Sequence, residues 1–161
     1  MDKVLLEIEK LPSFRLDPLP PQYTNRNERY LVVNESTGEV ISLVSPMFLL
    51  IQPRDLFRRI VKLASGLGTI ANVKVYWNSY QQFLELLFKE TIGSIDSNYR
   101  WGLRAVNDLS GRRSLTVHLM LWREECRNDL FLMFGDAIVH LKFNVKKIEI
   151  LLTKLPKLTK T

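Results

Sequence analysis

The sequence predicts an α+β fold: a largely antiparallel β-sheet with an N-terminal β-hairpin and about three helices packed on it. Three observations support this class. Two apolar runs flank a glycine-containing turn near the start, segments with helical spacing follow, and period-two alternation dominates the last third. Helices segregated from strands along the chain are typical of α+β domains.

The first 28 residues differ in composition from the rest of the chain. Apolar residues among the first eleven can share one face of a short helix. Prolines then interrupt helix and strand hydrogen bonding and favour extended polyproline conformation; they are Pro12, Pro18, Pro20 and Pro21. We therefore predict a flexible proline-rich arm over residues 1–28, followed by a single α+β domain over residues 29–161.

The predicted domain opens with a β-hairpin and a helix. Residues 29–34 and 39–44 are apolar runs, and Gly38 between them suits the positive φ of a turn. Pro53 is suited to the first turn of a helix and Gly66 to its end. This part of the chain therefore predicts strand, turn, strand and helix in that order.

Two further helices are predicted downstream. Ser79 and Gln82 have the spacing of a capping box, which predicts a helix over residues 79–93. Another helix is predicted over residues 98–110, with Gly111 as its stop.

Alternating segments predict the remaining strands. Residues 73–77 predict a short strand, because Val73, Val75 and Trp77 alternate with Lys74 and Tyr76. Residues 114–122 form the clearest long strand. Residues 138–145 alternate again. Residues 130–134 fit a strand or a helix equally well.

The chain is basic, with 23 Lys and Arg, 17 Asp and Glu, and a formal net charge of +6. This surplus favours phosphate-rich partners such as nucleic acid or an anionic membrane leaflet, although a solvated charged surface is the simpler alternative. Trp77, Trp101 and Trp122 could stack on bases or lie at a lipid interface. The candidate anion-binding residues, for membrane or nucleic acid, are Arg54, Arg58, Arg59, Lys62, Arg100, Arg104, Arg112, Arg113, Lys146 and Lys147.

No sequence motif predicts catalysis, a bound metal or a cofactor, and we expect no enzymatic activity. Cys126 is the only cysteine, which excludes an intrachain disulfide and favours a reducing compartment. A metal-dependent nuclease would need two or three convergent carboxylates. The acidic residues available for such a site are Glu85, Glu90, Asp96, Asp108, Glu124 and Glu125.

The sharpest motif is Pro20-Pro21-Gln22-Tyr23, which matches Pro-Pro-x-Tyr, the ligand pattern of WW domains. Two prolines preform a polyproline segment, so little entropy is lost when it docks into an aromatic groove. Tyr23 would then fill a second pocket. The alternative interpretation is a plain proline-rich linker.

A Pro-Pro-x-Tyr motif ahead of a basic α+β domain resembles the matrix proteins of rhabdoviruses and related negative-strand RNA viruses. The resemblance implies a structural protein that self-assembles, binds anionic membrane and nucleocapsid or RNA, and recruits host WW-domain ubiquitin ligases for budding. It implies a location in the host cytoplasm, at the inner face of the membrane and in the virion. The mixed charge of residues 1–10 departs from the lysine-rich start of the family, which shifts the expected membrane contact to the basic clusters of the domain.

Two alternatives from other functional classes remain open at this point. One is a single-stranded nucleic-acid-binding protein that uses the arginines and tryptophans. The other is a small metal-dependent nuclease of viral or archaeal origin.

Overall fold

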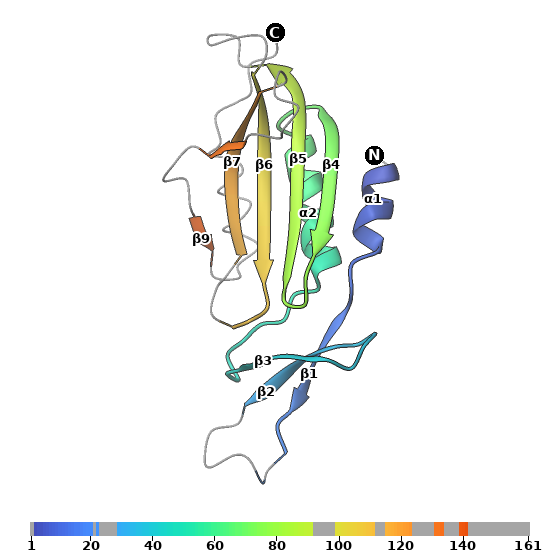
Figure 1. Cartoon of the computed structure of the whole chain (residues 1–161), viewed down its shortest axis with the longest axis vertical. Coiled ribbons are helices and arrows are strands. Elements are labelled where there is room, and N and C mark those ends of the chain that lie inside the picture. Colours follow the sequence, from blue (N-terminus) through green and yellow to red (C-terminus); the bar gives the residue numbers. More distant parts are fainter. Residues whose placement is uncertain are drawn as a thin grey trace.

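The computed structural model describes residues 2–20, 22, 29–91, 99–111, 115–123, 131–133 and 139–141. Within these ranges the chain forms two helices and two antiparallel sheets (Figure 1). The smaller sheet has the order β1 (Phe14–Pro18), β2 (Tyr30–Asn34) and β3 (Val40–Val44). The larger sheet has the order β4 (Ile70–Trp77), β5 (Gln81–Thr91), β6 (Tyr99–Asp108) and β7 (Leu115–Arg123), and two short strands, β8 (Phe131–Met133) and β9 (Val139–Leu141), pair with β7. The α+β class with antiparallel strands is thus confirmed.

The N-terminal segment is part of the folded domain, which corrects the prediction of a flexible arm for residues 2–20. Helix α1 (Asp2–Glu9) and the turn after it place Ile8 and Leu11, both with 0% exposure, in the main core. Strand β1 follows and pairs with β2. Because β1 is an edge strand, Pro18 at its end removes no hydrogen bond from a central ladder. The proline spacing therefore did not exclude secondary structure here.

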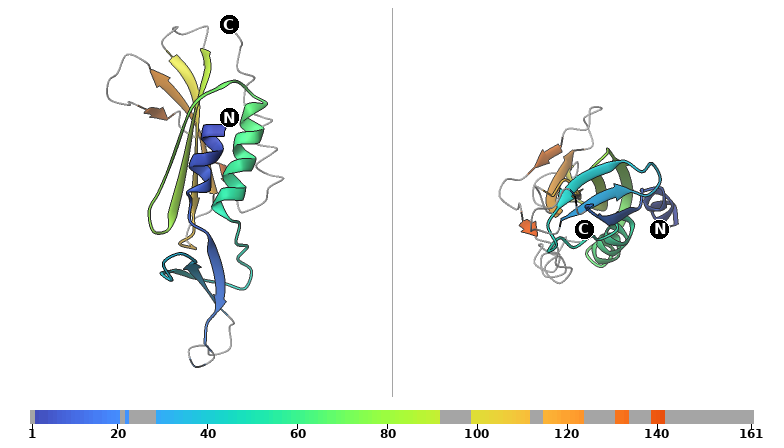
Figure 2. Two further views of the ribbon diagram at one scale, coloured as in Figure 1. Left: turned by 90° about the vertical axis from the view of Figure 1, so that its right-hand side faces the viewer. Right: turned by 90° about the horizontal axis from the view of Figure 1, so that it is seen from below.

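Helix α2 (Pro53–Ser65) lies where the sequence predicts it, with Pro53 in its first turn and Gly66 after its last residue. Its apolar face is buried against one face of the larger sheet, and α1 lies on that same side (Figure 2). The buried residues of this face are Leu56, Phe57, Ile60, Val61 and Ala64. Neither helix in the described part of the chain is long and apolar enough to cross a membrane.

The second predicted helix, over residues 79–93, is wrong: most of this segment is strand β5. Gln82, Leu84, Leu86 and Phe88 are buried in alternation with less buried neighbours. The apolar residues of the run satisfy helical and strand periods alike, and the pairing of β5 with β4 and β6 decides between them. The supposed helix cap is the β4–β5 turn, where the Asn78 side-chain oxygen accepts hydrogen bonds from two backbone amides.

The third predicted helix, over residues 98–110, is also wrong, because residues 99–108 form β6. Gly102 provides one physical reason. A Cβ at this position would lie 3.0 Å from the backbone oxygen of Leu86, so the glycine permits the close approach of β5 and β6. Leu103 and Ala105 face the main core from this strand, beside α2. The described residues therefore contain two helices in place of the predicted three, and only α2 coincides with one of those three.

The predicted hairpin strands, β2 and β3, pair with each other, and Gly38 between them has a φ of +72°. They belong to the smaller sheet, which lies beyond one end of the larger one, and neither α1 nor α2 packs on its face (Figures 1 and 2). A second core forms at the junction from Phe14, Val32, Val44 and Leu109.

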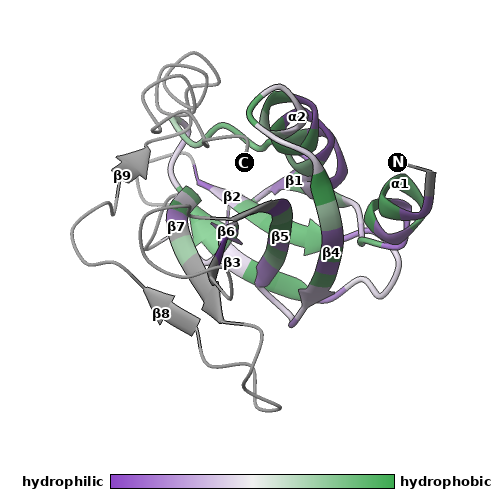
Figure 3. Ribbon diagram, turned by 90° about the horizontal axis from the view of Figure 1, so that it is seen from above, coloured by the Kyte–Doolittle hydropathy of each residue, from purple (hydrophilic) through white to green (hydrophobic). Residues whose placement is uncertain are grey.

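The junction between the two sheets is also hydrogen-bonded. The Gln52 side chain donates to the Phe14 carbonyl oxygen at 2.7 Å and accepts from the Phe14 amide at 3.0 Å. On the other side, the Ser42 hydroxyl donates to the Leu109 carbonyl oxygen at 2.5 Å. In Figure 3, hydrophobic and hydrophilic stretches alternate along the strands of the larger sheet, and both helices carry residues of each kind. The smaller sheet is thereby attached to the body of the domain by apolar packing and by buried polar contacts.

Candidate binding surfaces

The Pro-Pro-x-Tyr motif falls in the connection between β1 and β2. Pro20 and Gln22 are exposed, whereas Pro21 and Tyr23 lie outside the described residues. The ends of β1 and β2 that this connection joins point away from the larger sheet (Figure 1).

The two ends of this connection are fixed by backbone pairing. Pro18 lies opposite Tyr30 at the last position of the β1–β2 ladder. One residue further out, the Leu19 amide donates to the Arg29 carbonyl oxygen at 3.1 Å. The connection that contains the motif therefore joins two paired strands. This pairing was not predicted from the sequence, because the residues of β1 were assigned to a flexible arm.

Arg54 and Arg58 on α2 have intramolecular partners. The Arg54 Nε donates to the carbonyl oxygen of Leu11 at 2.7 Å and so satisfies a backbone acceptor just after α1. Arg58 forms ion pairs with Asp55 at 3.1 Å and with Glu9. These two arginines connect α2 to α1, and their charge is partly compensated within the domain.

Arg59 and Lys62 are exposed on α2 and line a shallow hollow of about 590 Å³. The lining also includes Asp55, Arg58, Leu63 and Gly66. This is the part of the described surface where predicted anion-binding residues come together. The other described members of that set, Arg100 and Arg104, lie on β6.

Arg104 belongs to a polar cluster on the face of the larger sheet that α2 does not cover. Its Nη2 donates to the Tyr76 hydroxyl oxygen at 3.1 Å, and its Nε lies 3.5 Å from the Glu85 carboxylate. The Tyr76 hydroxyl in turn donates to Glu85 at 2.8 Å. Burial, followed by the hydrogen bond and charge of Glu85, raises the pKa of Tyr76 above its ordinary value of 10.0. Glu85 thus compensates the charge of Arg104 inside the fold.

The aromatic rings beside this cluster are already stacked. The Tyr76 and Phe83 rings have centroids 4.6 Å apart and an interplanar angle of 7°. The Arg104 guanidinium lies 5.4 Å from the centroid of Phe83, and the Lys74 ammonium lies 5.5 Å from that of Tyr76. Each ring therefore has one face against the other ring and a cation within 6 Å of its centroid, which leaves little room for a nucleic-acid base to stack.

The tryptophans that were candidates for base stacking differ in environment. Trp101 is half-buried and packs against the main core. Trp77 is 43% exposed at the end of β4. The side chain of Trp122 lies outside the described part. The structure therefore does not bring the described tryptophan side chains together into one platform.

No group of three or more His, Cys, Asp or Glu residues within the described ranges could hold a metal ion. Glu85 lies in the cluster with Arg104. Asp108, at the end of β6, accepts hydrogen bonds from the Gln81 side chain at 3.1 Å and from the Ser110 amide at 2.8 Å. The remaining carboxylates of the nuclease hypothesis lie outside the described side chains, namely Glu90, Asp96, Glu124 and Glu125.

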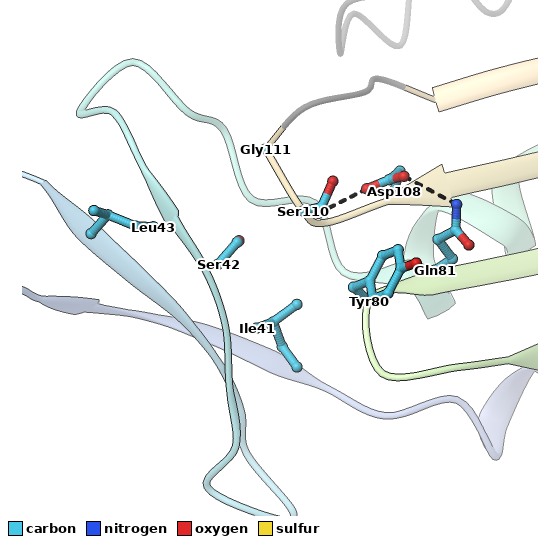
Figure 4. A pocket seen from close by; sticks show the side chains of 8 residues that line it. All are labelled: Ile41, Ser42, Leu43, Tyr80, Gln81, Asp108, Ser110 and Gly111. Atoms are coloured by element: carbon cyan, nitrogen blue, oxygen red, sulfur yellow. Dashed lines mark hydrogen bonds between the residues drawn. The ribbon is translucent and has the colours of Figure 1, made fainter.

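A groove of about 740 Å³ between β3 and the near end of the larger sheet has no counterpart in the sequence analysis (Figure 4). It exists because the two sheets meet at an angle, and no sequence motif signals such a junction. Its only ionisable acid, Asp108, is buried and hydrogen-bonded to neighbours that also line the groove. The lining residues are Ile41, Ser42, Leu43, Tyr80, Gln81, Asp108, Ser110 and Gly111.

The rest of the predicted anion-binding set, namely Arg112, Arg113, Lys146 and Lys147, lies outside the described residues. Comparison with models of known protein families, with curated proteins and with solved structures finds no match.

Proposed function

We propose that this chain is a viral matrix-type structural protein that recruits host WW-domain proteins through Pro20-Pro21-Gln22-Tyr23. The single observation that carries the proposal is the setting of the motif: it lies in the connection of two paired strands, and its described residues, Pro20 and Gln22, are exposed. A WW-domain ligand must be accessible, and the exposure of Pro20 and Gln22 supports this condition.

The length of the connection supports the proposal. Residues 19–29 separate the end of β1 from the start of β2. A polyproline helix rises about 3.1 Å per residue, so a four-residue motif needs roughly 12 Å of extended chain. The connection is long enough to hold such a stretch and still return to β2. Two anchored ends also restrict the unbound chain, which lowers the entropy lost on docking.

The recruitment test is calorimetric titration of the full chain with an isolated WW domain. We expect Tyr23→Ala and Pro21→Ala each to weaken binding by roughly tenfold or more, because each removes a side chain that would occupy a pocket. Gln22→Ala is the matched control, since the third position of the motif is variable. Unchanged affinity of Tyr23→Ala would exclude recruitment through this motif.

Membrane and nucleocapsid binding form the second part of the proposal. The net charge of +6 supports an anionic partner, and Arg59 and Lys62 beside the hollow on α2 are the described residues best placed to meet one. Self-assembly and a location at the inner face of the host membrane and in the virion complete the proposed role.

Sedimentation with phosphatidylserine vesicles tests this second part. Lys62→Glu should reduce binding more than Lys89→Glu, an equal charge change at an exposed position on β5. Equal losses of vesicle binding in the two variants would show that binding depends on the net charge of the protein and on no particular site on α2. The single-stranded nucleic-acid alternative is less well supported, because the rings of Tyr76 and Phe83 already stack on each other.

A further inference from the structure

We propose that the apolar turn after β3 inserts into the lipid interface when the protein binds a membrane. We define the apolar turn as residues 45–50. Met47 is 91% exposed and Leu49 is 59% exposed. Val40 and Leu43, on the adjoining strand, are 54% and 44% exposed. Isolated exposed apolar residues are common on protein surfaces, but four within ten positions indicate a contact surface.

The local structure fixes the direction of these side chains. Phe48 and Leu50 pack against the smaller core, so Met47 and Leu49 alternate with them and are directed outward. The Phe48 amide donates to the Ser45 carbonyl oxygen at 3.0 Å, which closes the turn. Polar residues at positions 47 and 49 would cost the fold little, because these side chains contribute little to the core. Their apolar character therefore points to a role outside the isolated chain.

The charge pattern fits a lipid interface. Residues 40–53 contain no charged residue, although charged residues make up 25% of the chain. Insertion of this segment would therefore require no charge to leave water. The net charge of +6 resides elsewhere and attracts the protein to an anionic leaflet, while the apolar side chains supply a contact that salt does not screen.

The shape of the surface favours a lipid over a protein partner. Met47 lies in a turn and is 91% exposed, so no groove formed by the described residues holds it. A convex apolar turn can enter a fluid acyl layer without a complementary pocket, whereas a protein partner must supply one.

This inference rests on the membrane binding in the proposed function and deepens it. The intramolecular pairing of Arg54 and Arg58 strengthens the case, because fewer charges on α2 are available to the lipid than the sequence suggests.

The experiment compares the full chain with a Met47→Ser/Leu49→Ser double variant on phosphatidylcholine vesicles with and without phosphatidylserine. The double variant should bind anionic vesicles roughly tenfold or more weakly, since two apolar side chains lose their burial. Leu6→Ser is the matched control, because Leu6 is 62% exposed on α1, outside the turn, and its loss should leave binding unchanged.

A fluorescence measurement reports insertion directly. Met47→Trp should gain a blue-shifted emission component on anionic vesicles, and Leu6→Trp should not. Wild-type-like vesicle binding by the double variant, or an unshifted Met47→Trp spectrum, would overturn the inference. It would likewise be overturned if the double variant lost self-association in solution but kept vesicle binding, because the turn would then contact a second copy.

WW-domain titration of the same variants separates this inference from the recruitment proposal. If Met47→Trp shows no blue shift on anionic vesicles while the wild-type chain binds WW domains, the lipid contact alone is contradicted. Loss of WW binding with intact insertion counts against recruitment alone.

Discussion

Replacing Ile8 by alanine tests whether the N-terminal segment belongs to the folded domain. Ile8 has 0% exposure on α1 and packs in the main core with residues of α2 and the larger sheet. A flexible arm would tolerate the change without loss of stability, whereas a core position would not. Leu6, on the same helix but 62% exposed, offers a matched control.

The expected magnitude follows from the side chain removed. Ile8→Ala deletes three buried carbons, each contributing about 0.8 kcal/mol of transfer free energy, or roughly 2.4 kcal/mol together. A residual cavity adds to this, so the free energy of unfolding should fall by about 3 to 4 kcal/mol. Leu6→Ala should change it by less than about 0.5 kcal/mol.

Urea unfolding followed by circular dichroism measures both variants. The midpoint should fall for Ile8→Ala while the slope with urea stays constant, since the folded state remains the same. If the two variants matched the wild type within about 0.5 kcal/mol, α1 would not be part of the cooperative unit, and the buried position of Ile8 would be refuted.

Three further predictions concern two buried polar residues of the larger sheet, one of its tyrosines, and two glycines with positive φ. Asn107 donates to Gln82 at 2.8 Å, and both are fully buried, so Asn107→Leu alone should cost about 1–3 kcal/mol. Adding Gln82→Leu should recover part of that loss in a double-mutant cycle, and simple additivity would contradict the pairing. The raised pKa of Tyr76 means that its stabilising contribution is complete below pH 10 and declines as the pH rises above 10 through the folded-state pKa. Tyr76→Phe should flatten that part of a stability curve against pH, and an unchanged slope would argue against the partly buried, hydrogen-bonded hydroxyl. Gly38 and Gly111 have φ values of +72° and +78°, so alanine at either should cost about 1 kcal/mol. Thermal denaturation should show a larger loss for Gly111→Ala, whose Cβ would lie 3.3 Å from a Val44 methyl group, than for Gly38→Ala, which has open space around it.

The sequence was most reliable where local signals act alone. Proline and glycine bracket α2 because the backbone geometry of these residues is constrained regardless of the surrounding fold. The alternation in the first half of β7 was readable because Thr116 and His118 separate its apolar residues, and Leu115 and Val117 are buried as that pattern requires. The anion-binding residues of α2 could be listed from the sequence, but the ion pairs of Arg58 with Glu9 and Asp55 could not.

The two wrong helix predictions arose where the same apolar residues fit both the helical and the strand period. The run that forms β5 is apolar at helical and strand spacings, and Leu84, Leu86 and Phe88 are buried only because β4 and β6 pair on either side. Arg100 and Arg104 share a face in a strand as they would in a helix, because a separation of four is compatible with both geometries. Local propensity therefore did not decide this part of the fold.

The sequence by itself determined the α+β class, the basic character, the helix α2 and the presence of the Pro-Pro-x-Tyr motif. Only the tertiary structure decided that residues 2–20 belong to the folded domain, because Ile8, Leu11 and Phe14 gain their burial from partners far along the chain. It likewise decided that the motif lies between two paired strands and that Met47 and Leu49 face outward. Such features depend on contacts between distant segments, and a linear pattern carries no record of which segments meet.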